Sequence, residues 1–158
     1  ERTFQLLTQV SGRAGRAKKA GKVFVQTFNP THYAIAYAKN HDYEGFYQQE
    51  MAVRHAGNYA PYFYTIQIQA SHTDENTIAK QMFQIVRWLK SRASNDVIIL
   101  GPSPKPIAKL RNRYYFQIIL KFKQRDEMDV LLTTLYNRAQ KAKDDLQLSV
   151  DRDPVSFL

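Results

Sequence analysis

From residue 61 to residue 158 the hydrophobic residues follow two periods in a fixed order, and this order constrains the fold more than any other feature. A period of two is typical of strands, and spacings of three and four are typical of amphipathic helices. Strand patterns occupy residues 64–70, 97–100, 116–122 and 146–150, with helical patterns between the first pair and between the last pair. The order β-α-β-β-α-β indicates the split, ferredoxin-like arrangement. We therefore predict an α/β fold of the α+β type, with two helices on one face of a four-stranded antiparallel sheet.

The segment between the second and third strand patterns is rich in proline. Three prolines lie within Gly101–Pro106. Proline has no backbone N–H to donate, so this segment is expected to form neither a helix nor a central strand. Val97–Leu100 is accordingly predicted to be a short buried strand. The first helix of this region is expected to be capped by Asp74 or Thr73.

Residues 1–60 show a different pattern, and we expect a domain boundary near residue 60. A first helical pattern stops at Gly12. The sequence then predicts a buried strand over Lys22–Phe28, a short helix capped by Thr31 that runs through Tyr37, and a longer helix capped by Asp42. Gly57 and Asn58 are expected to end that helix.

The charge of the chain points to an anionic partner. Twenty-three lysines and arginines oppose 14 acids, for a formal net charge of +9. The cations cluster, with six cations and one acid in residues 1–22, and seven cations and no acid in residues 101–125. Such clusters attract phosphate backbones. Nucleic acid is therefore the favoured partner class.

Several other classes of site are excluded or disfavoured by composition. The chain has no cysteine, which excludes disulfides and thiolate metal sites, and its four histidines lack metal-ligand spacing. No apolar run approaches the roughly 20 residues that span a bilayer. We therefore expect no membrane partner and a cytoplasmic location. Trp88 is interpreted as a core or domain-interface residue rather than a platform for stacking bases.

One string near the N-terminus carries a chemical signature. Residues 9–16 are Gln-Val-Ser-Gly-Arg-Ala-Gly-Arg, with Arg13 and Arg16 three positions apart on a glycine-containing loop. Glycine lets a backbone turn tightly and approach a partner closely. The planar guanidinium of arginine grips phosphate oxygens and suits the charge that develops as a γ-phosphate leaves. The alternative interpretation is a basic loop without a catalytic role.

This string resembles motif VI of superfamily 2 helicases, in which a glutamine precedes the arginine pair. The longer stretches TFQLLTQVSGRAGR (residues 3–16) and KVFVQTFNPTHYAI (22–35) resemble the PriA family of primosomal DNA helicases. The last residues, LSVDRDPVSFL, are similar to that family's closing strand with its Val-Asp-x-Asp-Pro signature. Arg152 is a departure, since a small apolar residue is usual there. The resemblance covers the whole chain and identifies it as a C-terminal fragment.

The resemblance implies roles for both segments. Residues 1–60 would complete the second RecA-like lobe of a helicase, and residues 61–158 would be a C-terminal DNA-binding domain. Gln9, Arg13 and Arg16 would face ATP and magnesium held by the first lobe, with Arg16 as the arginine finger. Members of the family move three-prime to five-prime on DNA and restart stalled replication forks together with other primosome proteins.

The resemblance also implies a protein partner. The family binds the acidic tail of single-stranded DNA-binding protein, and Arg125, at the start of the second helix, is our candidate contact. The zinc modules of the family would lie upstream of this chain, which itself is expected to hold no cofactor.

ATP hydrolysis needs parts that this sequence lacks. The nearest approach to a Walker A loop is Gly15–Lys22, but five residues separate its glycines and Val23 replaces the hydroxyl residue. Asp126–Asp129 resembles a DExD box in its spacing of acids. We interpret these acids instead as first-turn residues of a helix, where negative charge interacts favourably with the helix dipole. We therefore expect the chain alone to be inactive.

A second basic cluster provides candidate DNA contacts. Four cations precede a run of three aromatic residues, and cations beside rings that stack on unpaired bases suit single strands and forks. Strand alternation places Phe116 in the core and leaves Tyr115 as the exposed ring. The candidate DNA-binding residues are Lys105, Lys109, Arg111, Arg113 and Tyr115.

Two other functions remain open. A stand-alone RNA-binding module with the same β-α-β-β-α-β order usually carries a [KR]-G-[FY]-[GA]-F-V-x-[FY] run on its third strand. Residues 113–118 have no glycine and a different aromatic spacing. A docking domain with incidental charge is the other alternative, and its affinity for DNA would vary little with salt.

Overall fold

The computed structural model describes residues 1–14, 21–141 and 145–154. The chain forms two compact units, Glu1–Gly57 and Asn58–Leu158.

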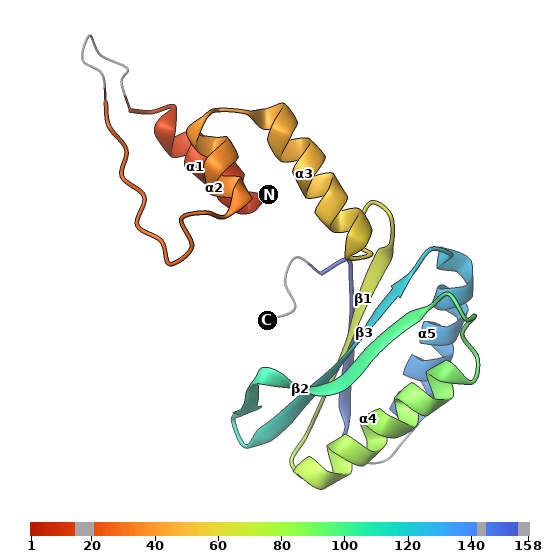
Figure 1. Ribbon diagram of the computed structural model, residues 1–158. Coiled ribbons are helices and arrows are strands. Elements are labelled where there is room, and N and C mark those ends of the chain that lie inside the picture. Colours follow the sequence, from red (N-terminus) through yellow and green to blue (C-terminus); the bar gives the residue numbers. More distant parts are fainter. Residues whose placement is uncertain (15–20, 142–144, 155–158) are drawn as a thin grey trace. The chain divides into compact units, whose positions relative to one another are not determined.

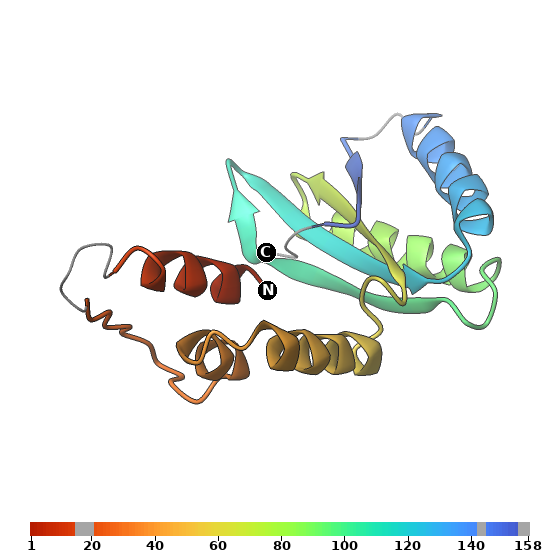
Figure 2. The ribbon, with the colours of Figure 1, turned by 90° about the horizontal axis from the view of Figure 1, so that it is seen from above.

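The second unit has its six elements in the predicted order (Figure 1). They are β1 (Tyr64–His72), α4 (Glu75–Lys90), β2 (Ile98–Leu110), β3 (Arg113–Phe122), α5 (Arg125–Lys141) and β4 (Gln147–Arg152). The strands lie in the order β2-β3-β1-β4, and each neighbouring pair is antiparallel. Both helices cover the same face of the sheet (Figure 2). The predicted fold is confirmed.

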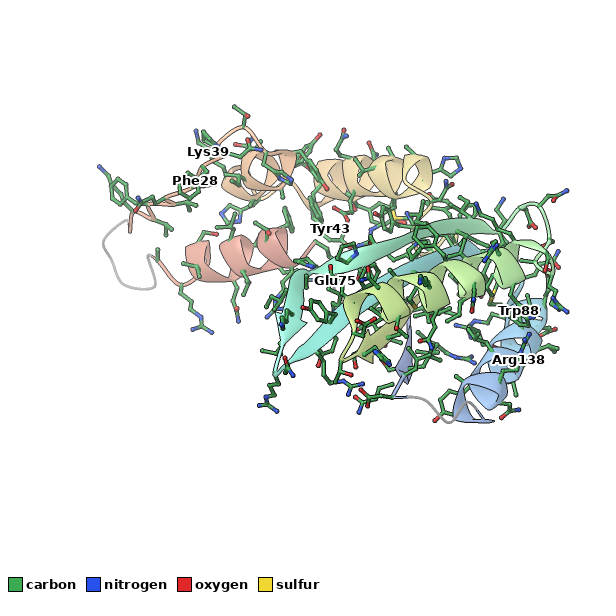
Figure 3. The ribbon with its side chains drawn as sticks, turned by 90° about the horizontal axis from the view of Figure 1, so that it is seen from below. Phe28, Lys39, Tyr43, Glu75, Trp88 and Arg138 are labelled. Carbon is green, nitrogen blue, oxygen red and sulfur yellow. The ribbon has the colours of Figure 1, made fainter. Side chains whose placement is uncertain are left out.

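The core of this unit lies between the sheet and the two helices. Ile68 of β1 faces Ile118 of β3 across the ladder, and both side chains are fully buried. Met82 of α4 and Met128 of α5 pack onto the same cluster and are equally buried. Burying one such side chain stabilises the fold by about 1.5–3 kcal/mol. Trp88 is half-buried against this core, as interpreted from the sequence, and the guanidinium of Arg138 lies 5.7 Å from its ring centroid (Figure 3).

The face of the sheet away from the helices, which we call the open face, is less exposed than alternation suggests. The alternation of apolar and polar residues over 64–70 predicts a half-buried strand with Thr65 and Gln67 on the solvent side, yet they are only 6% and 1% exposed. β1 is an interior strand, so its side chains have neighbours on both sides. Gln67 is hydrogen-bonded to Gln117 of β3, and Thr65 pairs with Lys121 of β3, whose ammonium lies over the ring of Tyr59. The expectation of a half-buried strand is therefore wrong for these residues.

The proline-rich segment belongs to an edge strand. β2 runs from Ile98 to Leu110, and among the described residues it pairs only with β3. The predicted strand over Val97–Leu100 was therefore too short, and its predicted buried position was wrong. An edge strand tolerates proline because one side of its backbone needs no ladder partner. The register with β3 shifts twice, between Leu100 and Ser103 and between Pro104 and Lys109.

Capping residues fix where the helices begin. Of the two predicted caps of α4, Asp74 and Thr73, the structure selects Asp74, which accepts a hydrogen bond from the backbone N–H of Thr77. In the first unit, Asp42 caps α3 (Tyr43–Ala56), also as predicted, and the helix ends at Gly57. The cap of the short helix α2 (Tyr33–Lys39) is His32 and not Thr31, because the Nδ1 atom of His32 accepts from the N–H of Ala34.

The first unit is a small helical cluster. It contains α1 (Arg2–Ser11), α2 and α3, whose buried contacts are made by Phe4, Ala34, Ala38 and Phe46. The rings of Phe4 and Phe46 stack with centroids 4.1 Å apart.

The predicted strand over Lys22–Phe28 is absent from the structure. The segment is exposed, and the side chains of Phe24 and Phe28 are almost fully accessible to solvent. Figure 3 shows Phe28. Its hydrophobic pattern suits a strand, but a strand forms only where another backbone offers hydrogen bonds. Within residues 1–14, 21–141 and 145–154 no strand pairs with it, which explains the error.

Candidate nucleic-acid interface

A chain of side-chain hydrogen bonds crosses the open face. Nε2 of Gln67 donates to Oε1 of Gln117 at 2.6 Å, and Nε2 of Gln69 donates to Oε1 of Gln67 at 2.9 Å. Nζ of Lys105 then donates to Oε1 of Gln69 at 3.0 Å. Lys105 lies on β2 and Gln69 on β1, with β3 between these strands in the sheet. The hydrogen bond therefore holds one candidate cation over the open face.

Arg113, a second candidate, is tied to its own chain. Its Nη1 atom lies 2.9 Å from a carboxylate oxygen of Asp145, and its Nε atom donates to Oγ of Ser71 at 3.0 Å. The hydrogen bond from Arg113, followed by one from Thr73, holds the pKa of Asp145 below its usual value. The ion pair joins the residues before β4 to the start of β3, and the hydrogen bond from Arg113 to Ser71 joins that point to the end of β1. The charge of Arg113 is thus partly neutralised.

Two candidate cations lie at the end of the β2–β3 hairpin. Arg111 and Asn112 form its turn, both with positive φ, which is typical of two-residue hairpin loops. Arg111 is exposed there. Nζ of Lys109 donates to the hydroxyl of Tyr114 at 3.1 Å and lies over its ring. We call this end, with Lys109 and Arg111, the basic hairpin tip.

Tyr115 pairs with Ser71 across the β1–β3 ladder and lies on the open face, where it is half-buried rather than exposed as predicted. Tyr114, its neighbour, points to the other face and packs against the core. The open face therefore brings together Tyr115, Lys105 and Arg113, whereas Lys109 and Arg111 lie at the tip.

Sequence reasoning missed a row of cations that lie over rings. The ammonium of Lys121 lies 3.5 Å from the ring centroid of Tyr59, and that of Lys123 lies 5.0 Å from the ring centroid of Phe63. The guanidinium of Arg125 lies 4.2 Å from the ring centroid of Tyr64. Each such contact stabilises by about 0.5–1 kcal/mol when exposed and about 2 kcal/mol when desolvated. The signal was present in the acid-free run of residues 101–125, but which rings these cations meet depends on the fold.

Arg125, the candidate for an acidic peptide, begins α5 and is 59% exposed. Besides covering the ring of Tyr64, its guanidinium forms an ion pair at 3.6 Å with Asp153.

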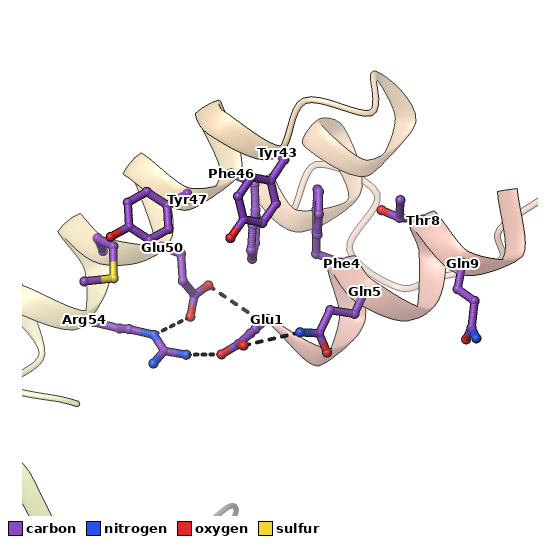
Figure 4. Close-up of a pocket in the computed structure, with 11 residues that line it drawn as sticks. Glu1, Phe4, Gln5, Thr8, Gln9, Tyr43, Phe46, Tyr47, Glu50 and Arg54 are labelled. Carbon is purple, nitrogen blue, oxygen red and sulfur yellow. Dashed lines mark hydrogen bonds and ion pairs between the residues drawn. The ribbon is translucent and has the colours of Figure 1, made fainter. Parts of the chain in front are cut away.

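The described residues of the motif-VI-like string, 9–14, lie at the end of α1 and in the turn that follows it. Gln9 is exposed on this helix and Arg13 is exposed in the turn that follows Gly12 (Figure 4 shows Gln9). Arg16 lies outside the residues that the structure describes, so its position relative to Arg13 is not part of this geometry.

A pocket of about 490 Å³ lies beside Gln9, between α1 and α3 (Figure 4). Glu50 at its edge accepts hydrogen bonds from Tyr33 and Arg54 at 2.7 and 2.8 Å. Burial, followed by the hydrogen bond to Glu50, raises the pKa of Tyr33 to about 12. Burial would raise the pKa of Glu50 itself, but the hydrogen bonds from Tyr33 and Arg54 outweigh it and hold this pKa below its usual value. This network joins α2 to α3.

Two classes of feature are not found in the described part of the chain. No group of three or more potential metal ligands occurs within residues 1–14, 21–141 and 145–154. None of the described helices is both long enough and apolar enough to cross a membrane.

Comparisons with known proteins agree with the resemblance seen in the sequence. A family model described as "Primosomal protein N C-terminal domain" matches residues 55–155. The chain is 44% identical to "Replication restart protein PriA" of Bacillus subtilis (strain 168), over 100% of this chain and 20% of that protein. It is 36% identical to the protein of the same name in Synechocystis sp., over 99% of this chain and 18% of that protein, and 31% identical to that of Haemophilus influenzae, over 98% and 21%. The chain thus spans about a fifth of the length of these relatives.

Proposed function

Because the chain belongs to the primosomal protein N C-terminal domain family, we propose that it is the C-terminal part of a replication restart protein, and that its second unit binds branched and single-stranded DNA. The relatives named as replication restart proteins support the first statement. The cations of the open face and of the basic hairpin tip support the second.

The single observation that carries DNA binding is the position of Lys105, Lys109 and Arg111. All three lie on the β2–β3 hairpin or its turn, and this stretch contains no acid that could neutralise them. Lys105 is turned over the open face by its hydrogen bond to Gln69. A line of cations beside a polar sheet face that carries a half-buried tyrosine is suited to a sugar–phosphate chain with unpaired bases.

Titration of forked, single-stranded and duplex DNA against this chain at two salt concentrations tests the proposal. If three cations contact a single strand, the logarithm of affinity should fall against the logarithm of salt with a slope of about −2. Forked and single-stranded DNA should bind more tightly than duplex DNA. Affinity that barely changes with salt would favour a docking domain instead. Tighter binding of a plain RNA hairpin than of a fork would favour an RNA-binding module.

The first unit belongs, in this proposal, to the second lobe of a three-prime to five-prime DNA helicase. Gln9, Arg13 and Arg16 would face ATP and magnesium held by the other lobe, where the two guanidinium groups would stabilise charge on the γ-phosphate. The exposed segment Lys22–Phe28 is compatible with this role, because it offers a free backbone to a sheet. The chain alone contains no Walker A sequence and should not hydrolyse ATP.

The proposal includes other primosome proteins and the acidic tail of single-stranded DNA-binding protein as partners, in the cytoplasm. An acidic peptide that bound Arg125 would have to replace Asp153 in the ion pair at 3.6 Å. That pair is exposed on both sides and is therefore weak.

A further inference from the structure

The open face contains a small hollow over β3, β1 and β4. Its volume is about 180 Å³, and five of its lining residues have side chains on the open face: Gln69, Ser71, Tyr115, Gln147 and Ser149. The pairing of the strands brings them together, since Ser71 faces Tyr115 on one side and Gln147 on the other, and Gln69 faces Ser149. We call this hollow the sheet pocket.

The chemistry of the sheet pocket is neutral and polar. The amides of Gln69 and Gln147 and the hydroxyl of Ser149 supply donors and acceptors, and Tyr115 adds one aromatic ring. The hydroxyl of Ser71 already accepts from Arg113 and donates to Oε1 of Gln147 at 3.4 Å. Among the described residues that line it, none is charged. Most pockets for drug-sized ligands exceed about 300 Å³, so this hollow suits a single planar ring system.

Cations lie immediately beside this neutral hollow. Gln69, which lines it, accepts the hydrogen bond from Lys105, and Ser71, at the other end, accepts one from Arg113. Arg113 is already paired with Asp145, so Lys105 is the cation with the larger uncompensated charge. A neutral polar pocket next to a cation matches a nucleotide, whose base is neutral and polar and whose phosphate is anionic.

We propose that the sheet pocket binds one unpaired base of DNA. Tyr115 contacts the face of the base, the amides of Gln69 and Gln147 hydrogen-bond to its edge, and Lys105 contacts the neighbouring phosphate. This inference rests on the proposed DNA binding and adds a site for the base to it. Binding in such a site requires an unpaired strand, because a base inside a duplex exposes neither its face nor its pairing edge.

The test compares two labelled oligonucleotides of equal length and charge, an oligothymidylate and the same strand with abasic residues, by fluorescence anisotropy with the 158-residue chain. Loss of even one stacked base should weaken binding by about fivefold or more. The preference for the oligothymidylate should persist in Tyr115→Phe, which keeps the ring, and disappear in Tyr115→Ala. Tyr136→Ala is the matched control, because Tyr136 is an exposed tyrosine on α5, on the covered side of the sheet.

Three outcomes overturn the inference in distinguishable ways. Equal affinity for both strands with a steep salt slope would exclude base binding in the sheet pocket and leave the proposed DNA binding intact. A base preference that survives in Tyr115→Ala would show that the base binds elsewhere. Absence of binding to either strand would contradict both the inference and the proposed function.

A second measurement does not depend on the folding of any variant. Thymidine monophosphate added to the unchanged chain should shift the side-chain amide NMR signals of Gln69 and Gln147 in a saturable manner. Inorganic phosphate at the same concentration should leave the signals of Gln147 in place, whereas those of Gln69 can respond to phosphate through its hydrogen bond with Lys105. Unshifted amides at saturating nucleotide, or shifts of Gln147 that are equal with phosphate, would overturn the inference.

Discussion

The ammonium nitrogen of Lys105 lies 3.0 Å from Oε1 of Gln69, so a cation of the edge strand β2 is tied to the interior strand β1. Lys105 follows Pro104, where the register between β2 and β3 shifts. Such irregularities bend a strand and redirect its side chains. The irregular, proline-containing part of β2 is therefore what lets this lysine reach across β3 to the open face.

Replacing this lysine by methionine (Lys105→Met) removes its charge and keeps most of its length. If Lys105 contacts one phosphate of single-stranded DNA, the slope of log affinity against log salt should become shallower by about 0.7. Affinity should fall by a similar factor for every sequence, because phosphate contacts carry no sequence information. Anisotropy titrations at several salt concentrations measure both quantities. Lys90→Met, which changes an exposed lysine at the end of α4, should alter neither, and equal effects in the two variants would exclude a specific contact.

Neutralising Asp145 should change stability and DNA affinity in opposite directions. Asp145→Asn removes the partner of Arg113, so the melting temperature should fall slightly while the freed guanidinium increases affinity for DNA. Asp129→Asn is the matched control, because it breaks an ion pair of 2.8 Å with Arg152 that involves α5 rather than the open face. Increased affinity in both variants would indicate a nonspecific effect of net charge.

The stability effect of Asp145→Asn should depend on pH. The pKa of Asp145 is held below its unfolded value of 3.8 by Arg113, so its contribution is present above pH 3.8 and is lost as pH falls through the folded value. The difference in melting temperature between parent and variant should thus be larger at about pH 7 than at pH values below 3.8. A difference that grows on acidification would contradict this assignment.

The core explains most of the stability of the second unit. Ile118→Ala removes a fully buried side chain from β3, and we expect the free energy of unfolding to fall by about 2–5 kcal/mol. Val130→Ala, on α5, removes a side chain that is 67% exposed and should change this free energy by no more than about 0.5 kcal/mol. Urea denaturation followed by circular dichroism measures both. Similar values for the two variants would be inconsistent with the described core.

Local signals were sufficient to predict most of the second unit. The alternation around Ile68 and Ile118 defined the buried face of two strands, and the pair Thr73 and Asp74 defined the start of α4 to within one residue. These signals work because a strand with one buried face must alternate, and because the first N–H groups of a helix need an acceptor. The helix caps of the first unit show the same principle at Asp42.

Features that depend on distant partners could not be predicted. Lys22–Phe28 has the composition of a strand, but the described residues provide no neighbouring strand. The length of β2 was underestimated because its prolines were read as excluding a strand. Proline is compatible with an edge strand but not with a central one, and whether a strand lies at the edge depends on the whole sheet.

The candidate site shows the same limit. Sequence analysis identified Lys105, Arg113 and Tyr115, and the structure places all three at the open face. It did not foresee that Asp145, 32 residues along the chain from Arg113, partly neutralises that arginine. Nor did it foresee that Lys121 lies over the ring of Tyr59. Charge clusters are visible in a sequence, but the partners that compensate each charge are not.

The arginines of residues 9–16 lead to a prediction for the longer protein. In a longer protein that contains this chain together with the ATP-binding lobe, Arg16→Ala should lower the rate of ATP hydrolysis by a factor on the order of 10³–10⁵. Loss of an arginine finger has an effect of this size in other phosphoryl-transfer enzymes. DNA affinity should remain nearly unchanged, because the cations of the second unit are untouched. Steady-state ATPase assays with saturating DNA, together with anisotropy titrations, separate the two effects.

Two further variants make the assignment specific. Arg16→Lys keeps the charge but loses the planar, two-pronged donor geometry, so its ATPase rate should remain far below that of the parent protein. Arg2→Ala removes an exposed arginine at the start of α1, and the glycine-containing turn follows the other end of this helix. This variant should leave ATP hydrolysis intact. Because Arg13 is exposed in the turn after α1, Arg13→Ala should also impair hydrolysis if both guanidinium groups act on one triphosphate. Normal turnover in Arg16→Ala would exclude the finger role, whatever DNA the second unit binds.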